Sequence, residues 1–521
     1  MEKFIISNEA NCKYCYKCLR NCPVKSISFS DNKSFVIDSE CILCGKCIEI
    51  CPQDAKNYLK NVDLLTKLFG KKFVVSIAPS FFAHFDNPFK VIAFLKKNGA
   101  IVNETSLGAE LVSKEYRKFG KSVISTACPV VVELVEKYFP EKLEFLAPVL
   151  SPAIAHAKIL RKLFGDLPLV FLGPCIAKKR ELEDYFDVVL TFEELEEILV
   201  NIDTEEYPDP PYPTNGRYYP ITSGIVKNVK LENHLIVEGI ENIKDFLSRL
   251  KKLDNNYFIE MSACVGGCIE GPATRKDISL IEKRVKLNKC IEKLPKSDVF
   301  LNLDVNLNRT FSNKKKEMFF SEEEIQNVLN SMGKSDKSKE LNCSACGYDT
   351  CREKAIAVLS NKAEKEMCVT YLIEKVSSVS NMVVEETPNL IIISQNGKIT
   401  YKNKIARLIF MSLSNNKVME LIKDIKDNFL KEIEINGKLH KFLAKRFILP
   451  ENSGEVFILT DVTKQLEQEE KMKRLKIQTI EKIEDVLNKQ MLLAQEIAGL
   501  LGESIAETKS RFMEFKKFME D

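Results

Sequence analysis

Two cysteine runs near the start of the chain restrict its fold more than any other feature. Both have the spacing C-x2-C-x2-C-x3-C followed by proline; they are Cys12, Cys15, Cys18, Cys22 with Pro23, and Cys41, Cys44, Cys47, Cys51 with Pro52. Thiols this close in sequence suit ligation of a shared metal centre better than disulfides. The chain has 17 cysteines, and their use as metal ligands implies a reducing compartment.

The repeated run is typical of bacterial two-cluster ferredoxins, in which the fourth cysteine of each run ligates the other cluster. One [4Fe-4S] cubane would then use Cys12, Cys15, Cys18 and Cys51, and the other Cys41, Cys44, Cys47 and Cys22. Zinc is the alternative, because C-x2-C pairs also bind zinc, but two full runs with trailing prolines have no role in a zinc ribbon. We therefore predict an α+β, ferredoxin-like electron-transfer domain over residues 1–60.

Four further cysteines lie in three separate motifs. Cys128 follows Ser-Thr-Ala, Cys175 follows Gly-Pro, and Cys264 and Cys268 share the segment Ser-Ala-Cys-Val-Gly-Gly-Cys. Each alone suits a buried, inert thiol. Together, four thiolates are the number that completes a cubane.

The region around these motifs alternates short apolar runs with helical periodicity, which favours an α/β fold. The expected strands are 73–78, 123–126, 167–172 and 188–190, and the expected helices are 129–138, 152–163 and 193–199, the last opened by the capping box Thr191-x-x-Glu194. Cys128 and Cys175 thus follow strand ends, where the loops of α/β folds carry ligand groups.

In these three motifs residues 65–300 resemble the H-cluster domain of [FeFe]-hydrogenases. The resemblance implies that Cys128, Cys175, Cys264 and Cys268 hold a cubane, with Cys268 bridging to a diiron subcluster that carries CO and cyanide. It also implies that Lys178 contacts a cyanide. The loop Ala78-Pro79-Ser80 matches a family segment that lines the diiron pocket, although an ordinary turn is an equal alternative.

The chain departs from the family pattern where protons should move. Ala127 replaces the cysteine that relays protons, Ala147 replaces a serine of the relay, and Tyr116 falls near one of its acids, whereas Glu181 survives. Alanine has neither a donor nor an acceptor in its side chain. Gly173 and Ser262 replace two methionines that pack the pocket. We expect a retained cluster site, with Lys178, Glu181 and Cys268 as its active groups, and slow proton transfer.

A linker is expected at 304–317, followed by a small domain over residues 318–372. This domain opens with the capping box Ser321-x-x-Glu324 and carries four cysteines, Cys343, Cys346, Cys351 and Cys368. The pattern resembles the four-cysteine [4Fe-4S] domain of several redox proteins. A structural zinc is the alternative.

The cysteines stop after residue 368. Residues 390–403 predict a hairpin with an Asn-Gly turn, and residues 378–465 together resemble an α+β PAS domain, a sensory and dimerising module. Residues 466–521 predict an amphipathic helix or coiled coil, because apolar residues recur at three- and four-residue steps from Ile480 to Leu501. Gly499 and Gly502 are expected to interrupt that helix.

Composition excludes some classes of function. Lys plus Arg total 77 and Asp plus Glu total 74, a formal net charge of +3, which does not favour nucleic-acid binding. No long apolar run or export signal is evident, so we expect a cytoplasmic protein without a membrane span. Cys290 and the histidines, His84, His156, His234 and His440, are expected to be structural or ordinary residues.

Three hypotheses follow. The first is a sensory [FeFe]-hydrogenase that binds or slowly oxidises H2, passes electrons through its cubanes, and signals to a downstream protein through the PAS domain and helix, as a homodimer. The second is an ordinary hydrogenase that exchanges electrons with ferredoxin or another redox partner. The third is a non-catalytic iron–sulfur redox sensor without the diiron unit.

Overall fold

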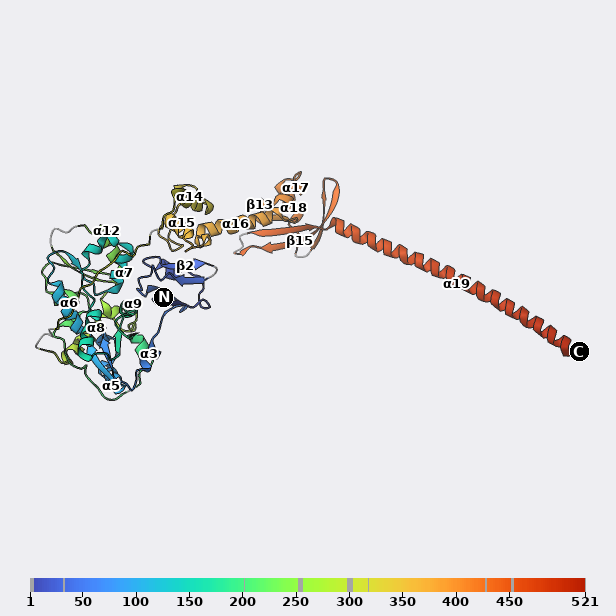
Figure 1. Cartoon of the computed structure of the whole chain (residues 1–521). Helices are drawn as coiled ribbons and strands as arrows, with labels where there is room; N and C mark the ends of the chain where they lie inside the picture. The colour runs from blue at the N-terminus through green and yellow to red at the C-terminus, as the bar shows by residue number, and fades with distance from the viewer. Residues whose placement is uncertain are drawn as a thin grey trace. The chain divides into compact units, whose positions relative to one another are not determined.

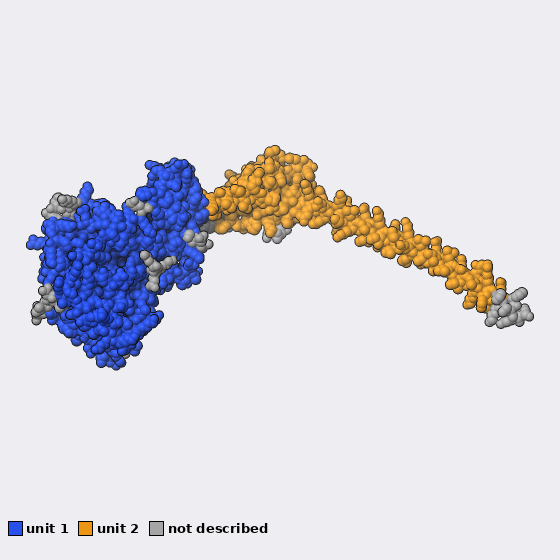
Figure 2. Space-filling model, viewed as in Figure 1, with its two compact units in different colours: residues 1–372 blue, residues 373–521 orange. Residues whose placement is uncertain are grey.

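The computed structural model describes residues 4–30, 33–200, 202–251, 256–297, 303–316, 318–426, 429–450 and 454–520. The chain divides into two compact units, residues 1–372 and 373–521 (Figure 2). All 17 cysteines belong to the first unit. Each unit is described below by itself.

Residues 4–60, here called the two-cubane module, contain two short antiparallel strand pairs. Strand β1 (Ile5–Ser7) pairs with β4 (Lys56–Tyr58), and β2 (Ile27–Ser30) pairs with β3 (Lys33–Val36). The single-turn helices α1 (Lys17–Arg20) and α2 (Lys46–Glu49) each start within a cysteine run. The rest of the module is loop, so its cysteines are presented mainly by backbone turns.

The central domain is built on two parallel sheets. The first has the strand order β6-β5-β8-β9, and the second has the order β10-β11-β7. The strands are β5 (Phe73–Ile77), β6 (Ala100–Glu104), β7 (Val123–Ile124), β8 (Leu169–Gly173), β9 (Val188–Thr191), β10 (His234–Glu238) and β11 (Phe258–Ser262). The first sheet is buried except at the partly buried Ile101, as expected of strands covered on both faces.

Helices join and cover these strands (Figure 1). They are α3 (Val62–Thr66), α4 (Phe81–His84), α5 (Pro88–Lys97), α6 (Ser106–Tyr116), α7 (Pro129–Tyr138), α8 (Pro152–Phe164), α9 (Ala177–Leu182), α10 (Phe192–Glu196), α11 (Gly224–Val229), α12 (Ile240–Arg249) and α13 (Leu280–Lys293). The predicted α/β alternation is confirmed, as is the capping box of Thr191 and Glu194. Helix α10 ends three residues earlier than expected.

Helices α6 and α8 approach closely at Gly108, which gives a first prediction. A Cβ atom on Gly108 would lie 2.1 Å from the carbonyl oxygen of Pro152 and 2.8 Å from the backbone nitrogen of His156. We expect Gly108→Ala to lower the free energy of unfolding by about 1–3 kcal/mol, because the two helices must move apart. Denaturant unfolding of the purified protein would measure this loss.

The control is Gly120→Ala, because a Cβ atom there would meet nothing within 4 Å. That variant is expected to stay within about 0.5 kcal/mol of the parent protein. Equal stability of the two variants would contradict the close approach of α6 and α8.

Residues 303–316 form no helix or strand, yet they are fixed to the central domain. Asn308 makes a bridge with Val149, and the amide of Arg309 donates to the carbonyl oxygen of Pro148 at 3.1 Å. Further along, the amide of Lys314 donates to the carbonyl oxygen of Glu136 at 2.8 Å. The expected linker is therefore an ordered strap on the domain surface.

Residues 321–372, here called the four-cysteine module, contain α14 (Glu322–Ser331), α15 (Cys351–Leu359) and the start of α16 (Val369–Glu386). The predicted capping box of Ser321 and Glu324 is confirmed. Figure 1 shows α15 beside β2 of the two-cubane module, and the amide of Phe29 donates to the carbonyl oxygen of Lys362 at 3.0 Å.

The second unit holds one antiparallel sheet of order β13-β12-β16-β15-β14. Its elements are β12 (Leu390–Gln395), β13 (Lys398–Lys402), α17 (Lys404–Ile409), α18 (Asn415–Ile422), β14 (Phe429–Ile435), β15 (Lys438–Ile448), β16 (Glu455–Asp461) and α19 (Thr463–Glu520). The Asn-Gly hairpin is confirmed, with positive φ at Asn396 and Gly397. The expected interruption at Gly499 and Gly502 is wrong, because α19 runs through both.

Among the described residues, no helix has the length and apolar character needed to cross a membrane.

Candidate metal centre

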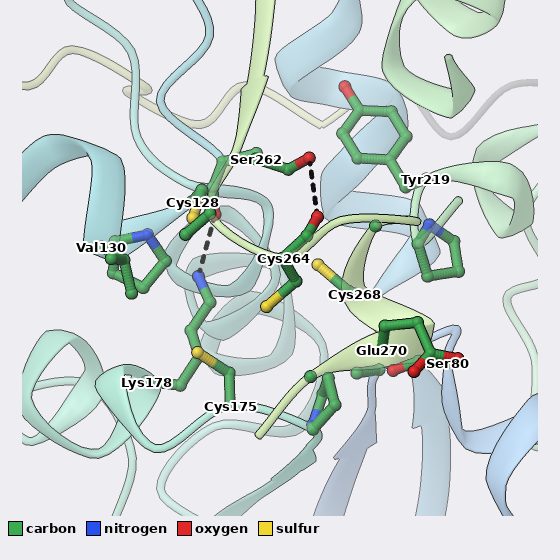
Figure 3. Close-up of a pocket in the computed structure, with 18 of the residues that line it drawn as sticks. Ser80, Cys128, Val130, Cys175, Lys178, Tyr219, Ser262, Cys264, Cys268 and Glu270 are labelled. Atoms are coloured by element: carbon green, nitrogen blue, oxygen red, sulfur yellow. Dashed lines mark hydrogen bonds between the residues drawn. The ribbon is translucent and has the colours of Figure 1, made fainter. Parts of the chain in front are cut away.

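The three cysteine motifs of the central domain meet at one cavity of about 360 Å³. Cys128 follows β7, Cys175 follows β8, and Cys264 follows β11, so all three come from the carboxyl ends of parallel strands. This is where open α/β sheets place their ligands. Cys268 joins them from the same loop as Cys264. Figure 3 shows the four cysteine side chains entering the pocket from these separate segments.

Cys128, Cys175 and Cys264 are partly buried, Cys268 is exposed to the cavity, and none of the four is paired in a disulfide. Their thiols lie close enough to influence one another. Burial raises the pKa of Cys268 to about 12, and Cys128 and Cys175 contribute in the same direction. Burial also raises the pKa of Cys175 to about 11, and that of Cys264 well above its ordinary value. The metal-free thiols of Cys175, Cys264 and Cys268 are therefore protonated at neutral pH, and loading with iron must release their protons. A set of four soft sulfur donors at one cavity fits an iron–sulfur cluster.

The predicted pocket residues lie at different distances from this cavity. Ala78, Pro79, Ser80 and Ser262 line it, and the buried Ser80 hydroxyl has no hydrogen-bond partner among the described residues. Gly173 does not line the cavity. It ends β8, where a Cβ atom would lie 2.5 Å from the Phe171 ring.

Lys178 lines the cavity, and Glu181 lies behind it. Lys178 Nζ donates to the carbonyl oxygen of Ala127 at 3.3 Å, to Ser151 Oγ at 3.4 Å, and to Glu181. Glu181 also accepts from Ser151 Oγ and from Arg309 Nη1, each at 3.1 Å. The Glu181 side chain is only 4% exposed, so two cations and a hydroxyl hold it in place.

The positions where the family relay would run are occupied as follows. Ala127 lines the cavity, Ala147 is fully buried, and the Tyr116 hydroxyl accepts from the amide of Thr126 at 2.9 Å. Burial raises the pKa of Tyr116 to about 12. The phenol is thus a fixed, neutral part of the core.

Glu260 is a cavity-lining residue that the sequence analysis missed. It lies in β11, it accepts from the amide of Val226 at 2.9 Å, and burial raises its pKa to about 7. A lone carboxylate in the otherwise apolar run Phe258–Met261 is the signal that could have identified it.

The two-cubane module brings its cysteines together crosswise. Cys22 lines one small cavity with Cys41, Cys44 and Cys47, although it belongs to the first run. Backbone amides donate hydrogen bonds to these sulfurs. The amide of Leu43 donates to Cys41 Sγ at 3.3 Å, and the amide of Ser26 donates to Cys22 Sγ at 3.4 Å. Such bonds favour the thiolate form that binds metal. Lys56, buried near Cys12, Cys18, Cys47 and Cys51, has its pKa lowered by burial.

The four-cysteine module also has a small cavity, which is lined by Cys343, Cys346, Cys351 and Cys368 together with Lys334 and Lys354. In the described part of the chain, no three His, Cys, Asp or Glu side chains are close enough to hold a single metal ion. Cys290 is buried in α13, outside every group.

Three family models match the chain. The 4Fe-4S dicluster domain matches residues 4–52, the C-terminal domain of the iron only hydrogenase large subunit matches residues 71–234 and 222–272, and a domain described as a putative Fe-S cluster matches residues 340–370. Residues 4–52 are thus a ferredoxin-like 4Fe-4S domain.

One curated relative is the NADP-reducing hydrogenase subunit HndD of Solidesulfovibrio fructosivorans. It is 23% identical over a 230-residue alignment that covers 32% of this chain and 39% of the relative. The chain therefore matches well under half of that protein's length.

Solved structures give weaker similarities. The [FeFe]-hydrogenase HydA1 from Chlamydomonas reinhardtii is 16% identical with a TM-score of 0.39, covering 50% of this chain and 100% of that one. The PAS domain of BvgS from Bordetella pertussis is 15% identical with a TM-score of 0.16, covering 19% of this chain and 97% of that one.

Proposed function

We propose a function for a chain whose central residues 71–272 belong to the [FeFe]-hydrogenase family: it binds or slowly oxidises H2 at an H-cluster and reports the result through its second unit. The observation that carries the proposal is Ala127 on the wall of the cysteine-lined cavity. A cavity that keeps four thiols and a lysine but offers no proton donor at that wall position suits H2 binding better than rapid turnover.

The residues of the cavity support this division of roles. When bound, an H-cluster supplies the centre at which H2 is converted to two protons and two electrons. The Lys178 ammonium, held by Ser151 and Glu181, places a positive charge at the cavity wall beside Ala127. Ala127 cannot pass a proton onward. The loss of a general acid–base group typically slows a reaction by about 10²–10⁴-fold.

The second unit supports a sensory output. Its sheet order β13-β12-β16-β15-β14, with α17 and α18 between β13 and β14, agrees with the PAS resemblance. Helix α19 exposes a row of large apolar side chains, among them Ile480, Ile483, Leu487, Met491, Ile497 and Leu501, each more than half exposed. Such a row suits pairing with a second copy of the chain or with a downstream signalling protein. Ferredoxin or a similar protein in the cytoplasm is the proposed electron partner.

The test is an infrared spectrum of the anaerobically matured protein in the CO and cyanide stretching region, first under argon and then under H2. We expect bands that shift under H2, together with an H2 turnover about 10²–10⁴-fold below that of a fast hydrogenase matured in parallel. A fast turnover would favour the ordinary hydrogenase instead. Absence of bands, with the parallel hydrogenase matured normally, would leave the non-catalytic iron–sulfur sensor.

A further inference from the structure

The four-cysteine module packs against the two-cubane module through a shared apolar core. Gly347 faces Leu19 so closely that a Cβ atom on the glycine would lie 3.0 Å from Leu19 Cγ. Around this contact, Lys362 forms an ion pair with Glu40 at 2.7 Å. Leu19 and Tyr348 are both buried in the same cluster of core residues. The two modules therefore form one packed body rather than two tethered ones.

One side chain joins the cysteine loops of the two modules. Arg20 Nη2 donates to the carbonyl oxygen of Cys15 at 3.0 Å, and Arg20 Nη1 donates to the carbonyl oxygen of Ala345 at 3.3 Å. Cys15 is an expected cluster ligand, and Ala345 precedes another, Cys346. Clusters held by loops that one guanidinium spans are neighbours, and electron transfer between centres is fast only when they are close.

The cavity of the four-cysteine module is also lined by two buried ammonium groups. Lys354 is 1% exposed and Lys334 is 5% exposed. Lys354 Nζ donates to the carbonyl oxygen of Glu364 at 2.5 Å and lies 5.4 Å from the centre of the Tyr348 ring. Lys334 Nζ donates to the carbonyl oxygen of Lys339 and to Thr370 Oγ1, each at 3.3 Å. All three hydrogen-bond acceptors are neutral oxygens. Cys346 and Cys368 favour the charged form of Lys354 most, and the Glu364 and Glu366 carboxylates favour it less.

Burying an ammonium group costs several kcal/mol unless negative charge compensates for it. A cluster ligated by four thiolates supplies such charge, and its reduced form carries one negative charge more than its oxidised form. A nearby fixed cation therefore stabilises the reduced form more than the oxidised form.

We propose that Lys354, assisted by Lys334, raises the reduction potential of the cluster in the four-cysteine module, so that this module is the electron-accepting end of the first unit. In the step itself, a reduced cubane of the two-cubane module loses one electron, and the oxidised cluster of the four-cysteine module gains it. No bond or proton changes place. The inference rests on the proposed loading with iron–sulfur clusters but not on any reaction with H2.

The experiment is a redox titration of the full-length, reconstituted protein with dithionite at pH 7, followed by electron paramagnetic resonance. The Cys346→Ala variant, which lacks one ligand of the four-cysteine module, identifies the signal of that module by difference. In the parent protein we expect this signal to develop first as the potential falls. If instead the signals of the two-cubane module develop first, the proposal is overturned, whatever the variants below do.

Charge variants test the role of the lysine. Lys354→Met should lower the ratio of reduced to oxidised cluster in the module at least tenfold at a fixed potential, which is 59 mV for one electron. Lys354→Arg keeps the charge and should restore most of the shift. Lys337→Met, at an exposed position of the same module, is the matched control and should leave the potential unchanged.

An unchanged potential in a loaded Lys354→Met protein would refute the role of Lys354. If that variant does not bind its cluster, Lys334→Met provides the same test. Its potential is expected to shift in the same direction but by less. An unchanged potential in Lys334→Met would refute the proposal. Because dithionite supplies the electrons, the titration gives its answer even for a protein without infrared bands. Failure of the hydrogenase proposal is thus distinguishable from failure of this one.

Discussion

Replacing Cys264 by alanine is expected to abolish loading of the central cavity and with it the proposed reaction with H2. Cys264 is one of four thiols that line this cavity, and burial with three neighbouring thiols raises its pKa well above the ordinary value. Only iron can compensate for deprotonating such a group, and alanine offers no ligand. We expect the CO and cyanide bands to vanish and the H2 activity to fall to background. Infrared spectra and iron content of protein matured in parallel would measure this.

The matched control is Cys290→Ala. Cys290 is buried in α13 and packs in the core of the central domain, away from the cavity. Its loss should cost about 1 kcal/mol of stability and leave the spectrum unchanged. Bands that survive in Cys264→Ala, or that disappear in Cys290→Ala, would mean that the ligands have been wrongly assigned.

Replacing Arg217 by methionine is expected to destabilise the central domain by about 3–5 kcal/mol, because it leaves a carboxylate buried without its partner. Arg217 Nε and Nη2 donate to the two carboxylate oxygens of Glu104 at 2.8 and 2.6 Å, and both side chains are at most 3% exposed. Burial already raises the pKa of Glu104 against the effect of the arginine. Arg217 Nη2 also donates to the carbonyl oxygen of Pro295 at 2.7 Å. Denaturant unfolding of the central domain would measure the loss.

The double variant Glu104→Gln with Arg217→Met separates charge burial from lost packing. It leaves no buried charge, so we expect it to be more stable than Arg217→Met alone. If the stability lost in the double variant equals the sum of the losses in the two single variants, the two residues are not coupled. The effect would then have to come from the contact of Arg217 with Pro295.

The strands and helices that position the cysteines could be predicted because their signals are local. The strand expected at 73–78 is β5 (Phe73–Ile77), and the helix expected at 129–138 is α7 with the same bounds. The strand is a mostly apolar run of β-branched and aromatic residues, and proline opens the helix, whose apolar residues recur at helical spacing. Cys128 lies four residues after β7, and Cys175 lies two residues after β8. Their arrival at one cavity then follows from the parallel order of the strands.

Contacts between distant segments could not be predicted in this way. Nothing in the local sequence of Arg309 indicates that its guanidinium binds Glu181, more than a hundred residues earlier, at 3.1 Å. The same holds for Lys354, whose helix periodicity does not reveal that it is buried beside four cysteines. The prediction that glycines interrupt helix α19 is wrong for a different reason. A glycine costs a helix only about 1 kcal/mol, which a helix of 58 residues tolerates at Gly499 and Gly502.

The ordered strap of residues 303–316 decides where the chain can be divided for study. A truncated protein that ends at residue 300 would keep every cysteine of the central cavity but would lose Arg309, and with it one of the two cations on Glu181. It would also expose Glu136, a 4% exposed carboxylate that accepts from Lys314 at 2.6 Å. An isolated fragment of the central domain should therefore extend to at least residue 316, and measurements on shorter fragments would describe a damaged site.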